Sequence, residues 1–285
     1  MKTYFDGSMN KVSKIILKIV SSNETFLTQA SKEKKEKVPF MIKSQYKVIT
    51  NDYEGHEFHT LNDKPDNHKH IIYFHGGAMC LNGGLPQYMM ISKWIKKTDA
   101  KATYMIYPMI PKYKLSEIYD ISLEMYQKVI ELYPDDEFIF MGDSAGALVI
   151  LSVMQLIKQK QVKMPKATIL ISPWLDFSLS NPDIKDYEEK DKILSLSRFK
   201  GLEAYDDIKN NKNIVSPMDY DYQEVIDIYL GTNDILYPDA CLFEEKNEHV
   251  HLRIFNEFPH VFALLPMKQS NKVHQGIIDI INSIS

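Results

Sequence analysis

The stretch Phe138-Ile139-Phe140-Met141-Gly142-Asp143-Ser144-Ala145-Gly146, followed by Ala147-Leu148-Val149-Ile150, decides the fold. An apolar run that enters Gly-x-Ser-x-Gly and leaves as a helix-forming run predicts a strand, a sharp turn and a helix. The glycines permit the tight turn, so the Ser144 hydroxyl is held exposed at the helix N-terminus. Ser144 is therefore a candidate nucleophile; the alternative is a glycine-rich turn with an incidental serine.

A serine hydroxyl is a poor nucleophile until a base removes its proton, so a histidine and an orienting carboxylate must accompany it. After an elbow of this kind, the acid precedes the histidine along the chain. Four of the nine histidines follow Ser144. His249 and His251 lie at or in a predicted strand, and His274 lies in a terminal helix. His260 lies in a loop beyond the last predicted strand and is the candidate base.

The acid is sought after the predicted strand Val225–Leu230, where the chain continues as Gly231-Thr232-Asn233-Asp234-Ile235-Leu236-Tyr237-Pro238-Asp239. Asp234 is nearer the strand end and is favoured as the orienting acid. Asp239 follows a proline and is also suited to capping the next helix. It remains the alternative acid.

Acyl transfer also needs hydrogen-bond donors for the oxyanion. The predicted strand Ile71–Phe74 runs into His75-Gly76-Gly77-Ala78, which is the place expected for an oxyanion loop. The segment Gly76, Gly77 and Ala78, together with the amide of Ala145, is the predicted oxyanion hole. His75 is expected to anchor this loop rather than to act as a base.

These segments together resemble the hormone-sensitive-lipase group of α/β-hydrolases, which includes many bacterial carboxylesterases. The resemblance extends from Lys69 to the C-terminus and rests on His75-Gly76-Gly77-Ala78, Gly142-Asp143-Ser144-Ala145-Gly146, Ser172-Pro173-Trp174-Leu175-Asp176, Asp234-Ile235-Leu236 and His260-Val261-Phe262. It implies an α/β-hydrolase fold with a mostly parallel central sheet, helices on both faces and a helical cap. Ala78 and Ala147 stand where the group often has glycine. Trp174 is expected to fill the core at the sheet edge and to contact an acyl group.

The rest of the chain fits this organisation. Tyr46–Leu61 alternates polar and apolar residues as an antiparallel strand pair does. Further short apolar runs predict strands buried on both faces: Ala102–Tyr107, Phe138–Met141, Ala167–Ile171 and Val250–Phe255. We expect a cap of N-terminal helices, residues 1–45, and an insertion, residues 178–222, around a hydrolase core of residues 46–177 and 223–285. Val12, Ile15, Ile16 and Ile19 share one face of a predicted helix.

Composition narrows the functional classes. The chain has 285 residues, 44% hydrophobic and 25% charged, which fits one large domain with an inserted segment. A net charge of −4 disfavours nucleic acid as a partner. Cys80 and Cys241 form no zinc or redox motif, and no apolar run approaches the ~20 residues of a membrane helix. We expect a cytoplasmic protein without a membrane span, as a monomer or homodimer.

Histidine pairs raise the question of a metal. His56 and His59, and His68 and His70, have ligand-like spacing, but no converging carboxylate is evident in the sequence, so these side chains are expected to be solvated. No nucleotide-binding glycine motif is present either. We predict no metal and no cofactor.

The sequence thus predicts a serine carboxylesterase that hydrolyses short-chain acyl esters through Ser144, His260 and Asp234. The same machinery could act as an amidase, peptidase, thioesterase or deacetylase. A non-catalytic ligand-binding module of this fold is a third possibility, which would require a broken triad.

Overall fold

The computed structural model describes residues 1–6, 24–32, 36–208 and 213–284. The described residues form a nine-stranded sheet of order β1-β9-β8-β7-β6-β4-β5-β3-β2, in which only the pairs β2–β3 and β3–β5 are antiparallel. The strands are β1 (Lys2–Phe5), β2 (Val48–Tyr53), β3 (His56–Leu61), β4 (Lys69–Phe74), β5 (Lys101–Met105), β6 (Glu137–Asp143), β7 (Ala167–Ile171), β8 (Ile226–Gly231) and β9 (Val250–Phe255). Each predicted strand is present, with ends moved by at most two residues.

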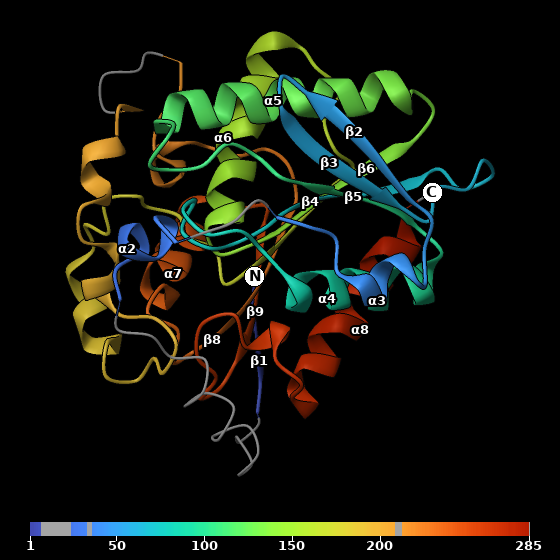
Figure 1. Ribbon diagram of the computed structural model, residues 1–285. Helices are drawn as coiled ribbons and strands as arrows, with labels where there is room; N and C mark the ends of the chain where they lie inside the picture. The colour runs from blue at the N-terminus through green and yellow to red at the C-terminus, as the bar shows by residue number, and fades with distance from the viewer. Residues whose placement is uncertain (7–23, 33–35, 209–212, 285) are drawn as a thin grey trace.

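Helices cover both faces of this sheet (Figure 1). They are α2 (Phe26–Ala30), α3 (Phe40–Lys43), α4 (Leu85–Thr98), α5 (Leu115–Leu132), α6 (Ala145–Lys160), α7 (Tyr237–Lys246) and α8 (Lys268–Ser283). Successive side chains of a strand point to opposite faces, so Ile72 and Phe74 pack with α5, α6 and α7, while Ile71 and Tyr73 pack with α3, α4 and α8. The predicted α/β architecture is confirmed.

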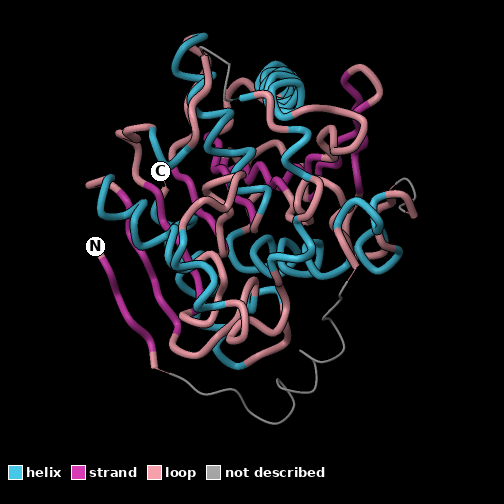
Figure 2. Tube along the Cα trace, turned by 90° about the vertical axis from the view of Figure 1, so that its left-hand side faces the viewer, coloured by secondary structure: helices cyan, strands magenta, loops and turns pink. Residues whose placement is uncertain are grey.

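The N-terminus departs from the expectation of helices throughout residues 1–45. Lys2–Phe5 instead forms the edge strand β1 (Figure 2). It pairs in parallel with β9, and their register aligns Phe5 with Phe255. Their rings stack with centroids 4.7 Å apart. A four-residue strand is too short for a periodic signal in sequence, and its hydrogen bonds come from a strand about 250 residues away. The predicted helix around Val12–Ile19 lies outside the described residues.

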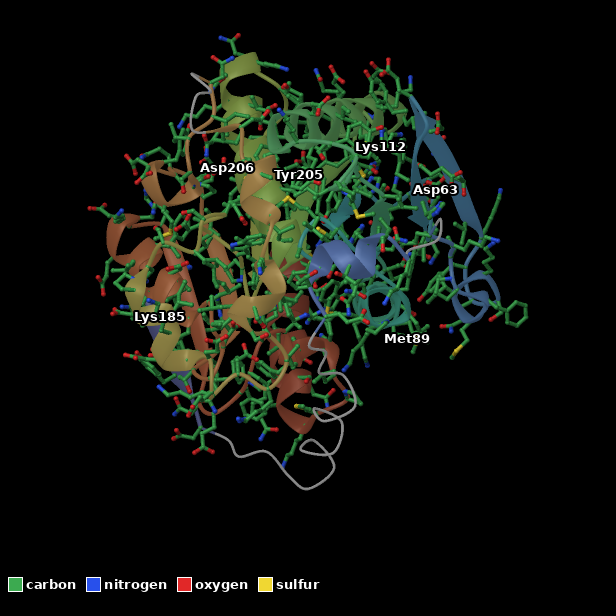
Figure 3. The ribbon with its side chains drawn as sticks, turned by 60° about the vertical axis from the view of Figure 1, so that its left-hand side comes forward. Asp63, Met89, Lys112, Lys185, Tyr205 and Asp206 are labelled. Carbon is green, nitrogen blue, oxygen red and sulfur yellow. The ribbon has the colours of Figure 1, made fainter. Side chains whose placement is uncertain are left out.

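The insertion between β7 and β8 has no strand in its described part. It contains the 3-10 helices η1 (Pro182–Tyr187), η2 (Leu196–Phe199), η3 (Leu202–Tyr205) and η5 (Pro217–Asp219). Figure 3 shows Lys185, Tyr205 and Asp206 on this insertion. Helix α2 contacts it through the Phe26 ring, whose centroid lies 4.2 Å from the Arg198 guanidinium and 5.2 Å from the Phe199 ring. The N-terminal segment and the insertion therefore pack together.

No helix in the described part of the chain combines the length and apolar character needed to cross a membrane.

Candidate active site

Ser144 occupies the sharp turn between β6 and α6. Its φ of 52° and ψ of −117° are strained for a residue with a side chain, at a cost of about 1–3 kcal/mol. The flanking glycines make the turn possible. A Cβ on Gly146 would lie 2.0 Å from the Phe74 carbonyl oxygen, and one on Gly142 would lie 2.8 Å from the same atom. The turn therefore lies too close to the end of β4 for any larger residue.

Backbone hydrogen bonds from the neighbouring strand hold this strained turn. The Ser144 amide donates to the Ile171 carbonyl at 2.9 Å, and the Trp174 amide donates to the Ser144 carbonyl at 3.0 Å. Ala145 is the first residue of α6, so its amide belongs to the helix turn whose N–H groups lack intrahelical partners. The nucleophile and a donor for negative charge are thus fixed by the same turn.

The three residues predicted as a triad come together. His260 Nε2 lies 2.9 Å from Ser144 Oγ, and His260 Nδ1 lies 3.0 Å and 3.1 Å from the two carboxylate oxygens of Asp234. Asp234 is fully buried and His260 is 4% exposed. Asp239 does not contact His260; it lies in the first turn of α7, where its Oδ1 accepts a hydrogen bond from Asn181 at 2.8 Å. The structure therefore favours Asp234 as the orienting acid.

The loops that carry Asp234 and His260 are joined to each other. Gly231 ends β8 so close to the histidine loop that a Cβ there would lie 1.9 Å from the Phe258 carbonyl oxygen. The Asn233 amide donates to that oxygen at 3.0 Å. On the other side, the Val261 amide donates to the Ser172 hydroxyl at 2.9 Å. Neighbouring main-chain contacts thus set the position of the His260 ring.

Electrostatics favour the protonated form of His260. Burial opposes protonation, but attraction to Asp234, with further contributions from Asp191 and Asp143, outweighs it and raises the pKa of His260 above 6.5. An imidazolium forms at this position when the histidine accepts the serine proton. The surrounding carboxylates therefore stabilise the charge that the base would acquire.

The predicted oxyanion segment has the backbone conformation expected of a tight loop. Gly77 has a φ of 115°, and a Cβ there would lie 2.4 Å from the Leu81 carbonyl oxygen. Ala78 adopts a left-handed φ of 55° despite its Cβ. His75 is fully buried with its ring stacked on Tyr107, whose hydroxyl donates to the His75 carbonyl at 2.6 Å. His75 anchors the loop, as expected.

Gly76 requires a correction, because its amide is already used. The Gly76 N–H donates to Asp143 Oδ1 at 2.9 Å, and the Tyr73 hydroxyl donates to the same carboxylate oxygen at 2.5 Å. A backbone N–H directed at this carboxylate is not available to an oxyanion. Asp143 instead ties the elbow to the oxyanion loop, and the remaining predicted donors are Gly77, Ala78 and Ala145.

Trp174 fills the core, as predicted. Its indole is 1% exposed and lies between Phe177, stacked at 5.0 Å between ring centroids, and Phe199, edge-on at 4.9 Å. The indole N–H donates to the Asp176 carbonyl at 2.6 Å. The ring is covered by protein, so Trp174 is a packing residue beneath the elbow. Its contact with an acyl group stays a prediction.

A carboxylate that the sequence did not single out lies beside the triad. Asp191, from the insertion, is 6% exposed. Asp191, Asp234 and His260 each have an oxygen or nitrogen atom that could bind a metal ion, and these three atoms lie within 4.8 Å of one another. Among the described residues, this is the one cluster of such side chains close enough to hold a metal ion. His260 Nδ1 faces Asp234 and its Nε2 faces Ser144, so both ring nitrogens already have partners in the triad.

The histidine pairs considered as metal ligands lie elsewhere. The expectation of solvated rings is wrong for His59 and His70, which are 4% and 0% exposed. His70 Nδ1 lies 2.9 Å from Asp136 Oδ2, and His68 Nδ1 lies 3.4 Å from Asp136 Oδ1. A carboxylate therefore does converge on this pair, but Lys101 also contacts it at 2.7 Å. The ammonium group makes this cluster an ion-pair network.

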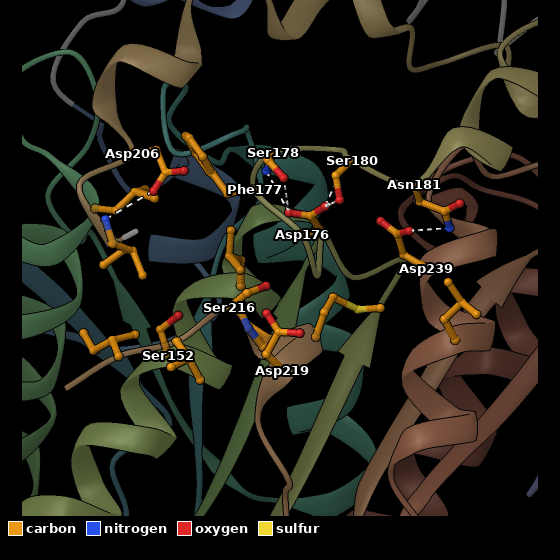
Figure 4. Close-up of a pocket in the computed structure, with 18 of the residues that line it drawn as sticks. Ser152, Asp176, Phe177, Ser178, Ser180, Asn181, Asp206, Ser216, Asp219 and Asp239 are labelled. Atoms are coloured by element: carbon orange, nitrogen blue, oxygen red, sulfur yellow. Dashed lines mark hydrogen bonds between the residues drawn. The ribbon is translucent and has the colours of Figure 1, made fainter. Parts of the chain in front are cut away.

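A pocket of about 620 Å³ lies between α6 and the insertion (Figure 4). Its lining combines apolar side chains, including Leu148 of α6, with aspartates that are bonded to neighbours. Asp176 accepts hydrogen bonds from Ser178 and Ser180, and Asp239 accepts one from Asn181. None of Ser144, Asp234 and His260 lines this pocket.

Comparison with known proteins agrees with this geometry. Residues 71–264 match a family model described as alpha/beta hydrolase fold. An esterase from Acinetobacter venetianus is 29% identical over 191 residues, which are 65% of this chain and 63% of that esterase. The chain thus spans less than two thirds of that relative.

Two solved structures have the same fold. A Staphylococcus aureus protein to which an esterase function has been ascribed has a TM-score of 0.83 at 21% identity, covering 94% of this chain and 99% of its own. A hormone-sensitive lipase from a metagenome library has a TM-score of 0.76 at 18% identity, covering 98% of this chain and 99% of its own.

Proposed function

Since the chain belongs to the α/β-hydrolase fold family, we propose that it is a serine carboxylesterase in which Ser144, His260 and Asp234 cleave short-chain acyl esters. The observation that carries the proposal is the continuous path from Ser144 Oγ through both nitrogens of His260 to Asp234, with every link at 3.1 Å or less. This order of nucleophile, base and acid is the arrangement that activates a hydroxyl.

The proposed reaction has two halves. Ser144 Oγ attacks the ester carbonyl carbon while His260 Nε2 takes the hydroxyl proton, and the resulting oxyanion is held by the amides of Gly77, Ala78 and Ala145. Collapse of this intermediate breaks the bond to the alcohol oxygen, which receives the proton from His260. Water then attacks the acyl-enzyme with His260 again as the base, releasing the carboxylic acid and restoring Ser144.

The preference for short acyl chains rests on the insertion. Asp191 places this segment beside Asp234 and His260, and we expect the same insertion to bound the acyl-binding side of the site. Each buried methylene adds ~0.8 kcal/mol of binding only until the wall is reached, so binding should fall for longer chains. The resemblance to bacterial esterases implies a preference for about two to eight carbons.

A panel of p-nitrophenyl esters of increasing chain length, run beside matched amide and thioester substrates, tests this function. We expect the highest kcat/KM on short esters, and we expect Ser144→Ala to lose several orders of magnitude in turnover with an unchanged circular dichroism spectrum. Faster cleavage of the amides or thioesters would reassign the bond that is broken. Absence of turnover on every substrate, with no acylation of Ser144 by a fluorophosphonate probe, would identify a binding module.

A further inference from the structure

We propose that Asp191 is a positioning residue of the catalytic triad, through which the insertion holds the Asp234 loop and places a second negative charge beside His260. The inference rests on the proposed hydrolase function and extends it to a residue outside the predicted triad.

The first observation is the hydrogen bonding of Asp191. Its Oδ2 accepts from the Ile235 amide at 2.9 Å, so this carboxylate holds the peptide that immediately follows Asp234. Its Oδ1 accepts from the amides of Ile193 and Leu194 at 2.9 Å and 3.2 Å, which turns the insertion around the same side chain. Asp234 Oδ1 in turn accepts from the Leu236 amide at 2.9 Å. One carboxylate of the insertion thus fastens the loop that carries the orienting acid.

The second observation is the electrostatic cost of burying Asp191 beside Asp234. Asp191 is 6% exposed and faces a second buried carboxylate, Asp234. Burial and the repulsion by Asp234 raise the pKa of Asp191 to about 6, while attraction to His260 acts in the opposite direction. Two like charges in a water-poor site destabilise the fold unless a positive charge compensates them. Protonated His260 is the group that compensates here.

The charges that act on His260 come from three separate elements. Asp234 lies on the loop after β8, Asp191 on the insertion, and Asp143 at the end of β6; the attraction of all three raises the pKa of His260. Asp143 also accepts hydrogen bonds from Gly76 and Tyr73. Asp191 is therefore the contribution from the insertion to the basicity of the triad.

Asp191→Asn tests this role, because it removes the charge while nearly preserving shape. We expect the acid limb of the kcat/KM profile to move to lower pH by about one unit, since a charge at this distance shifts a neighbouring pKa by that order. Asp239→Asn is the matched control. Asp239 is likewise buried with its pKa raised to about 6, but it bonds Asn181 and makes no contact with His260. The acid limb of the kcat/KM profile of Asp239→Asn should coincide with that of the wild type.

The titration of the His260 ring in the resting protein provides a readout independent of turnover. Histidine-ring NMR, with His260→Gln used to assign the signal, should show the same downward shift in Asp191→Asn. Retention of the wild-type His260 titration in folded Asp191→Asn, whatever its melting temperature, would reduce Asp191 to a structural role. Should Asp191→Asn not fold, the wild-type ring signal must show a second step near pH 6 from Asp191; a single step would overturn the proposal. Failure of the esterase function itself would instead appear as wild-type protein without turnover.

Discussion

Asp239→Asn should stabilise the protein in a strongly pH-dependent way. Asp239 is 1% exposed, and its Oδ2 has no hydrogen-bond partner among the described residues. Burial, together with repulsion from Asp176, raises the pKa of Asp239 from 3.8 to about 6 against the opposing hydrogen bond from Asn181. The shift of roughly two units corresponds to about 3 kcal/mol.

The sign follows from where the proton binds. Between the unfolded value of 3.8 and the folded value of about 6, the folded protein holds a proton that the unfolded chain has released. The stabilisation of the folded protein by this bound proton is therefore lost as the pH rises through that window, and the loss is complete above it. Asparagine stays neutral in both states and does not suffer the loss. The free energy of unfolding of Asp239→Asn relative to wild type should rise by up to about 3 kcal/mol between about pH 4 and about pH 7.5.

Urea unfolding, followed by the fluorescence of the two buried tryptophans, Trp94 and Trp174, measures this difference at each pH. The titration of Asp191 occurs in both proteins and cancels in the difference. Asp183→Asn, which replaces an exposed aspartate of the same insertion, is measured beside it as a control for the substitution itself. A pH-independent difference for Asp239→Asn would refute the reasoning, since it would mean that Asp239 ionises equally easily in the folded and unfolded chains.

Four further outcomes are expected. Asp234→Asn should lower turnover by up to ~10⁴, because the carboxylate that orients His260 Nδ1 is lost; turnover within tenfold of wild type would show that another group orients the ring. Gly77→Ala should abolish activity, because the new Cβ would lie 2.4 Å from the Leu81 carbonyl oxygen. Ala78→Gly should remain active and keep at least the wild-type melting temperature, because a left-handed φ costs alanine about 1 kcal/mol or more. The acid limb of kcat/KM should be centred above pH 6.5, since the pKa of His260 is raised, and a pH-rate profile with a lower midpoint would contradict this.

The candidate site was predictable wherever its residues sit in a continuous local pattern. Gly142, Ser144 and Gly146 lie within five residues, and their spacing already carries the geometry of a turn between a strand and a helix. The order of the triad along the chain then singled out His260, and the end of a predicted strand favoured Asp234. Each of these inferences used only neighbours in sequence.

Sequence patterns failed where one residue depends on distant parts of the chain. Gly76 looked like an oxyanion donor until the fold placed Asp143 at 2.9 Å from its amide. The sequence predicted that Trp174 fills the core but did not identify Phe177 and Phe199 as the rings that pack on it. Lys2–Phe5 gave no strand signal, since its pairing partner β9 lies at the other end of the chain.

By itself the sequence determined the class of fold and the candidate nucleophile, because apolar runs and the elbow motif encode local backbone conformation and the position of the serine in the turn. Tertiary structure alone decided which carboxylates surround His260. Asp191 lies in a polar stretch without periodicity. It is 44 residues away in sequence from Ile235, whose amide donates a hydrogen bond to it. Electrostatic influence depends on distance and burial in space rather than on separation along the chain, so only the folded protein brings that charge to the triad.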